Sequence, residues 1–133
     1  MHTSTIILDT NEYIYGLTGI KKPCADLIGK LSTFKVKLPR IILDELHKNL
    51  SEDLLKDLYK LLRVAQVDIV GEKVSIDLVN KYKLPYEDAI IASYCEHLLV
   101  DVLVSENRHF LVGFRPKSFK VFSAHDFLTS TFA

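Results

Sequence analysis

The sequence alternates between two periodicities, and this alternation limits the possible folds more than any other feature. Short segments rich in apolar and β-branched residues predict strands at residues 4–9, 34–38, 67–70, 101–105 and 119–123. All but one of the gaps between them predict helices, at residues 10–17, 23–32, 40–50, 52–64, 72–82 and 85–99. The remaining gap, 106–118, predicts a loop or one short turn. We therefore expect an α/β fold, a three-layer α/β/α sandwich with a central parallel sheet of about five strands.

The apolar runs also indicate where strands lie in the sheet. Residues 5–8 (TIIL) and 101–104 (DVLV) are continuously apolar apart from their first residue, as in parallel strands buried on both faces. Residues 34–38 (FKVKL) alternate, which favours a position nearer an edge. No repeat or linker divides the chain, so we expect residues 1–133 to form a single domain.

Composition excludes several classes of protein. Hydrophobic residues make up 48% and charged residues 26%, too apolar for a disordered chain. The 17 basic residues balance the 17 acidic ones, so any surface that attracts nucleic acid must be local. Cys24 and Cys95 stand singly in apolar runs, which predicts buried thiols and suits a reducing compartment. The chain shows neither a signal peptide nor an apolar run near the ~20 residues of a membrane span, so we expect a cytoplasmic protein without membrane contact.

Asp9 stands where the first strand should end. In an open parallel sheet, ligands bind at the carboxyl ends of the strands, near the point where the strand order reverses. Ser105 ends the fourth predicted strand. If these two strands are neighbours, residues 9–11 (DTN) and 105–107 (SEN) open onto one crevice. The alternative is that Asp9 only caps the helix that follows it.

Two predicted helices carry further acids toward the same region. Glu45 lies three positions after Ile42 and four before Asn49, so the three share a helical face. This face is either the buried side of the helix or only borders the buried stripe.

Asp88 shares a helical face with the apolar residues at positions 91, 92 and 95, which predicts that it faces the sheet. It lies in the first turn, where a carboxylate also complements the helix dipole. Glu87 points outward and is the alternative capping acid.

Three elements thus direct a carboxylate to one place, and this arrangement needs a counter-charge. Two unit charges about 4 Å apart repel by roughly 4 kcal/mol at an effective dielectric near 20. A divalent cation removes this repulsion. The histidines are scattered at positions 2, 47, 97, 109 and 125, and we expect them to be surface or packing residues. Ligands that are all oxygen favour Mg²⁺ or Mn²⁺ over Zn²⁺.

Four segments together resemble a known family. They are IILDTNEYIYGL, ILDEL, YEDAIIASYCEH and DVLVSENRHFL, and in this order they look like the successive motifs of the PIN domain. The ordered set, which spans nearly the whole chain, carries the resemblance. It implies a Rossmann-like sandwich and a Mg²⁺- or Mn²⁺-dependent ribonuclease, in many members the toxin of a VapC-type toxin–antitoxin pair.

The resemblance also implies roles for individual residues. The catalytic and metal-binding acids would be Asp9, Glu45 and Asp88. Supporting positions around the metal would be Thr10, Asn11 and Ser105. Asn107 stands where many members carry Asp, and Glu106 is shifted by one position, so either could complete the metal site. We expect one tight metal site and a weaker second one.

Hydrolysis of a phosphodiester at an acidic site requires basic residues that hold the substrate. The basic residues expected to contact RNA are Lys21, Lys22, Lys37, Arg40 and Arg108. The alternative for each is a solvated surface position. Single-stranded RNA is the expected substrate, because its bases are accessible for stacking.

Two other functions compete with a ribonuclease. A binding module with a degenerate metal site is motivated by Asn107. A phosphoacceptor signalling domain would need an adjacent acidic pair after the first strand and a lysine after the last, and the sequence has neither. An antitoxin and a second copy of the chain are the expected protein partners, and the leucine-rich residues 54–62 predict a surface for one of them, with core packing as the alternative. The RNA target and the antitoxin are not specified by the sequence.

Overall fold

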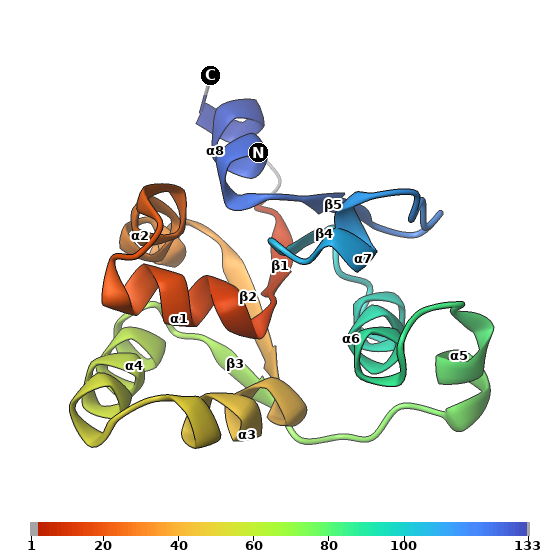
Figure 1. The fold of residues 1–133 in the computed structure, drawn as a ribbon, viewed down its shortest axis with the longest axis horizontal. Helices are drawn as coiled ribbons and strands as arrows, with labels where there is room; N and C mark the ends of the chain where they lie inside the picture. Colours follow the sequence, from red (N-terminus) through yellow and green to blue (C-terminus); the bar gives the residue numbers. More distant parts are fainter. Residues whose placement is uncertain (1–2, 133) are drawn as a thin grey trace.

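The computed structural model describes residues 3–132 (Figure 1). The strands are β1 (Thr5–Leu8), β2 (Lys35–Pro39), β3 (Asp68–Val70), β4 (Val102–Val104) and β5 (Lys120–Phe122). The helices are α1 (Thr10–Thr18), α2 (Lys22–Gly29), α3 (Arg40–Asn49), α4 (Glu52–Val64), α5 (Ile76–Lys81), α6 (Tyr86–His97), α7 (Arg108–Leu111) and α8 (Ala124–Phe132), with a 3₁₀ turn η1 (Leu31–Thr33). None of these helices is long and apolar enough to cross a membrane.

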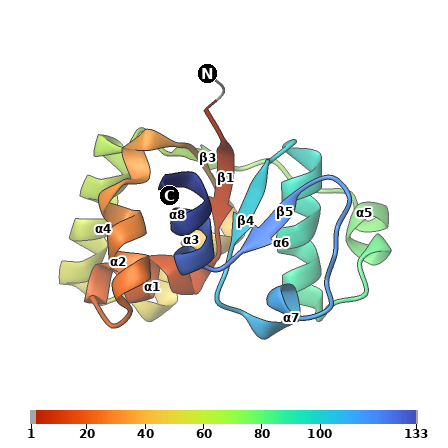
Figure 2. The same cartoon turned by 90° about the horizontal axis from the view of Figure 1, so that it is seen from above.

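The sheet is parallel throughout, and its five strands have the order β3-β2-β1-β4-β5. The chain moves outward from β1 to β3 and then crosses back to β4. Because parallel crossovers are right-handed, this reversal puts α5 and α6 on the opposite face of the sheet. Figures 1 and 2 show α1 to α4 on one side of the molecule and α5 and α6 on the other. The predicted three-layer sandwich is therefore confirmed.

β1 and β4 are neighbours at the centre of the sheet, as the continuous apolar runs indicated. Ile7 stands in register with Leu103, and both are fully buried. The Asp9 N–H continues the ladder beyond β1, donating to the Val104 carbonyl at 2.9 Å. The segments DTN and SEN consequently emerge at the same edge of the sheet, where the strand order reverses.

α4 uses its leucine-rich face mainly in the core. Leu58 and Leu62 are buried, and Leu54, Leu55 and Leu61 are half-buried against the core. Core packing therefore accounts for the inner part of this face, and its outer part remains a predicted contact surface.

α8 was not predicted from the sequence. Ser123 accepts from the Asp126 N–H at 3.1 Å, and the Glu106 carboxylate accepts from the Ala124 N–H at 2.9 Å. Phe127 is buried and packs against Phe34, with ring centroids 5.0 Å apart. Part of what stabilises the first turn of α8 thus comes from the loop after β4, which a local pattern does not reveal.

Candidate metal centre

A cleft of about 220 Å³ opens where the carboxyl ends of β1 and β4 meet α1, α3 and α6. Six of the residues singled out in the sequence line it: Asp9, Thr10, Asn11, Glu45, Asp88 and Asn107. The polar lining thus comes from positions far apart in the chain. Its acids stand together because the start of α1, which Asp9 caps, lies at the same edge of the sheet as α3 and α6, which carry Glu45 and Asp88.

Asp9 is the most buried acid of the cleft, with 8% of its surface exposed. Its Oδ1 accepts from the Thr10 N–H and its Oδ2 from the Ser105 hydroxyl, both at 2.8 Å. Asp9 is therefore both the N-cap of α1 and a lining residue of the cleft. Burial raises the pKa of the Asp9 carboxyl; the two hydrogen bonds oppose this shift, and the charge of Asp88 adds to it.

Asp88 is the second acid of the cleft, with its side chain 14% exposed. Its Oδ1 accepts from the Asn107 amide at 3.1 Å, and its Oδ2 lies 2.8 Å from His109 Nδ1. The N-cap position of α6 is Pro85, which makes no side-chain capping hydrogen bond. His109 is exposed at the surface, as expected, but its ring also contacts Asp88 at the edge of the cleft, which was not expected. The sequence signal that could have indicated this contact is the position of His109 two residues after Asn107.

Glu45 borders the buried stripe of α3. Its neighbours Ile42 and Leu46 are buried, whereas Glu45 is half-buried and lines the cleft together with Ile42 and Asn49. The Asn49 amide donates to the Glu45 main-chain carbonyl at 2.8 Å. The Glu45 carboxylate is thus more accessible than that of Asp9.

The three supporting positions differ in placement. Ser105 is fully buried behind Asp9; besides donating to Asp9, its hydroxyl oxygen accepts from the Asn107 N–H at 3.0 Å. Thr10 is half-buried in the cleft wall. Asn11 is exposed, and its side chain makes no hydrogen bond to any residue between 3 and 132, so it does not brace the Asp9 turn in this structure.

Asn107, and not Glu106, lines the cleft. The Glu106 side chain turns toward α8 and joins Glu12 and Cys24, with ligand atoms of the three within 4.8 Å of one another. Cys24 donates to Glu12 Oε2 at 3.1 Å. Burial, followed by the neighbouring Glu106, raises the pKa of Glu12 to about 9, so that Glu12 is protonated at neutral pH. Glu12 has no distinctive spacing in the sequence, so this buried acid was not predicted.

The predicted basic residues do not gather at the cleft. Lys21 lies beyond the far end of α1, where its Nζ is over the Tyr15 ring, 4.7 Å from the ring centroid. Two others form ion pairs: Lys22 with Asp26 at 3.1 Å and Lys37 with Asp68 at 2.6 Å. Arg40 is exposed at the start of α3, next to the cleft residue Ile41. Arg108 lines a neighbouring groove.

The donor set of the cleft suits a hard cation. Its potential ligands are mainly carboxylate oxygens, and the charge of Asp88 adds to the raised pKa of Asp9. In residues 3–132, the only set of three or more His, Cys, Asp or Glu residues with ligand atoms mutually within 4.8 Å is the Glu12 cluster, so the cleft acids do not form a closed cage. Mg²⁺ usually keeps several of its waters and binds one or two carboxylates. An open acidic cleft therefore suits Mg²⁺ better than a closed site with four protein ligands, which is typical of structural zinc.

Comparison with known proteins bears on the fold. No protein-family model and no curated protein matches the sequence. A solved structure does match: the crystal structure of VapBC2 from Rickettsia felis bound to a DNA fragment from their promoter. The alignment covers 88% of this chain and 96% of that one, with 19% identity and a TM-score of 0.58. This chain has a PIN-like fold.

The PIN-like fold gives the cleft its context. At this level of identity the match concerns the backbone arrangement and not the chemistry of individual side chains. In a PIN-like sheet of order 3-2-1-4-5, the reversal between β1 and β4 is where a ligand site is expected. The acidic cleft of this chain lies at that reversal.

Proposed function

We propose that this chain is a Mg²⁺- or Mn²⁺-dependent endoribonuclease that cleaves phosphodiester bonds of single-stranded RNA. One observation carries the proposal: Asp9, Glu45, Asp88 and Asn107, from four separate segments, line one cleft at the reversal of the sheet. The PIN-like fold supports it, because that fold is associated with nucleases.

The chain's own residues would divide the work. Asp9, held by two hydrogen bonds, and Asp88, held by Asn107 and His109, would bind the cation, with Glu45 and Asn107 completing the set. A bound divalent cation would activate a water and neutralise the phosphoryl oxygens. Glu45, the more accessible acid, would orient the attacking water and accept its proton.

The biological role we propose is that of the toxin in a type II toxin–antitoxin pair, acting in the cytoplasm as a homodimer. The similar solved structure is described as a VapBC2 complex, which supports an antitoxin partner for this chain. The half-buried outer leucines of α4 are the surface we propose for protein contacts.

A binding module with an inactive site is the second candidate. Both Asp88 oxygens already accept hydrogen bonds from Asn107 and His109, which lowers their capacity for a cation. This candidate predicts RNA binding without cleavage.

Cleavage of a labelled single-stranded RNA by the purified chain tests the proposal. We expect cleavage with Mn²⁺ or Mg²⁺, none with EDTA, and little on the same sequence in a duplex. Asp88→Asn, purified in parallel, controls for a contaminating nuclease. Equal cleavage by this variant, or no cleavage by the native chain with either metal, would overturn the proposal.

A further inference from the structure

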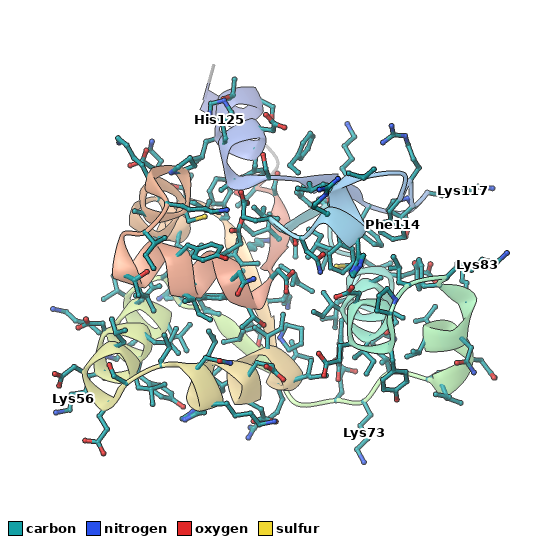
Figure 3. All side chains as sticks on the ribbon, viewed as in Figure 1. Lys56, Lys73, Lys83, Phe114, Lys117 and His125 are labelled. Atoms are coloured by element: carbon teal, nitrogen blue, oxygen red, sulfur yellow. The ribbon has the colours of Figure 1, made fainter. Side chains whose placement is uncertain are left out.

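A second, larger groove of about 890 Å³ lies on the α6 side of the molecule. It is lined by the end of α5 with residues 82–85, and by α7 with residues 112–118. Lys83 and Lys117 line it from these two segments, and in Figure 3 both project from the same side of the molecule.

The groove is strongly basic. Lys83, Arg108, Arg115 and Lys117 line it, all are exposed, and none of them forms an ion pair within residues 3–132. A fifth cation, Lys81, is paired with Glu96 at 2.6 Å. With one acid against five cations, an anionic ligand is favoured on an otherwise neutral chain.

The groove also contains aromatic rings. Tyr82 and Phe114 line it, both are half-buried, and their ring centroids lie 5.9 Å apart in an edge-to-face arrangement. Phe114 is supported from behind by Phe110 and Phe119, at 5.8 and 6.1 Å. The Tyr82 hydroxyl donates to Glu96 at 2.7 Å, which holds its ring in place. Aromatic rings between basic side chains are typical of surfaces that bind single-stranded nucleic acid.

The groove adjoins the candidate metal centre through one contact. His109 lines the groove, and its Nδ1 lies 2.8 Å from Oδ2 of Asp88, which lines the acidic cleft. A strand lying along the groove would therefore reach the cleft at this pair. The basic residues predicted near α2 and β2 lack such a connection, because they lie elsewhere and Lys22 and Lys37 are ion-paired.

We propose that this groove binds the part of a single-stranded RNA adjacent to the bond that is cleaved. Lys83, Arg115 and Lys117 would contact phosphates, and Phe114 and Tyr82 would stack on bases. The inference rests on the proposed function for its connection to cleavage, but its central claim concerns RNA binding.

The charge claim is tested by fluorescence anisotropy with a labelled 12-nucleotide single-stranded RNA in EDTA, where no cleavage occurs. The variant K83Q/K117Q removes two groove charges, and K56Q/K73Q removes two exposed lysines that do not line the groove (Figure 3). For two lost phosphate contacts, we expect a Kd about tenfold or more weaker and a salt slope reduced by about 1.4. The control should stay within about twofold of the native chain.

The stacking claim is tested with a second matched pair. Phe114→Leu removes a ring that lines the groove, and Phe119→Leu removes a ring of the same aromatic cluster that does not. We expect Phe114→Leu to weaken RNA binding about fivefold or more. Phe119→Leu should lower the melting temperature without a comparable loss of affinity.

These measurements separate this inference from the proposed function. If both lysine variants lost RNA affinity equally, or if K83Q/K117Q kept the native affinity, the groove assignment would be overturned. The groove would then be assigned to a protein partner instead. Metal-dependent cleavage by the native chain would survive that result. Conversely, failure of cleavage with selective loss of binding in K83Q/K117Q would support the groove and overturn only the nuclease.

Discussion

The Ser105 hydroxyl donates a 2.8 Å hydrogen bond to Asp9 Oδ2 across 96 residues of sequence. Both residues are buried, and the same hydroxyl oxygen accepts from the Asn107 N–H at 3.0 Å. Ser105 therefore joins the end of β1 to the loop after β4. This one side chain therefore contacts two residues of the cleft and helps to position both.

Ser105→Ala should loosen this junction. Asp9 Oδ2 would lose its buried donor, which costs about 1–3 kcal/mol of unfolding free energy. Because supporting hydrogen bonds orient metal ligands, we expect the affinity for Mn²⁺ to fall about 10–100-fold. Calorimetric titration with Mn²⁺ measures this loss, and Ser105→Thr, which keeps the hydroxyl, should recover most of it. Undiminished Mn²⁺ affinity in the alanine variant would contradict a positioning role.

Asp9→Asn should separate stability from activity. The amide keeps the size of the side chain and its capping ability but removes a charge that burial and Asp88 both disfavour. In metal-free buffer the melting temperature should therefore be unchanged or raised. Metal-dependent RNA cleavage should fall by at least about a hundredfold. If Asp9 served only as a helix cap, the variant would melt lower and keep its cleavage.

Glu12→Gln should change how stability depends on pH. The folded-state pKa of Glu12 is about 9 and the ordinary value is 4.5, so between these values folding binds a proton. The free energy of unfolding should therefore fall as pH rises through this range. Glutamine keeps an acceptor for the Cys24 thiol and does not titrate. The free energy of unfolding of the glutamine variant should depend less steeply on pH, and at pH 8 it should exceed that of the native chain by at least about 1 kcal/mol.

Urea unfolding of both chains at pH 5, 6.5 and 8 measures the effect of Glu12→Gln. Asp9 also has a raised pKa and contributes a slope of the same sign, but it does so in both chains. Parallel slopes for the two chains would show that Glu12 is ionised in the folded state.

Gly16→Ala should destabilise the contact between α1 and α2. A Cβ at Gly16 would lie 2.9 Å from the Cys24 carbonyl oxygen and closer still to the Ile28 side chain, so the helices would have to shift. We expect a loss of about 1–3 kcal/mol despite the better helix propensity of alanine. Gly29→Ala is the matched control, because a Cβ there meets nothing within 4 Å. Thermal unfolding of both variants distinguishes a packing effect from a general effect of glycine replacement.

Several features followed from the sequence because they depend on local patterns. Apolar residues repeat every second position in a strand and about every 3.6 in a helix, so the elements from β1 to β5 were predicted to within a few residues. Continuous apolar runs correctly put β1 and β4 inside the sheet. Asp9, Glu45 and Asp88 were singled out because each stands at a strand end or on a helix face directed toward that edge.

Only the tertiary structure decided which distant groups meet. His109 beside Asp88, Ser105 beside Asp9 and the protonated Glu12 beside Glu106 are pairs that no periodicity encodes. The pKa of a side chain and the hydrogen bonds that it makes depend on its burial and on the charges beside it. Burial and neighbouring charges depend in turn on how the layers pack. The same holds for the basic groove: Lys83 and Lys117 are 34 positions apart in the sequence, and they share a surface because α6 returns the chain to the centre of the sheet.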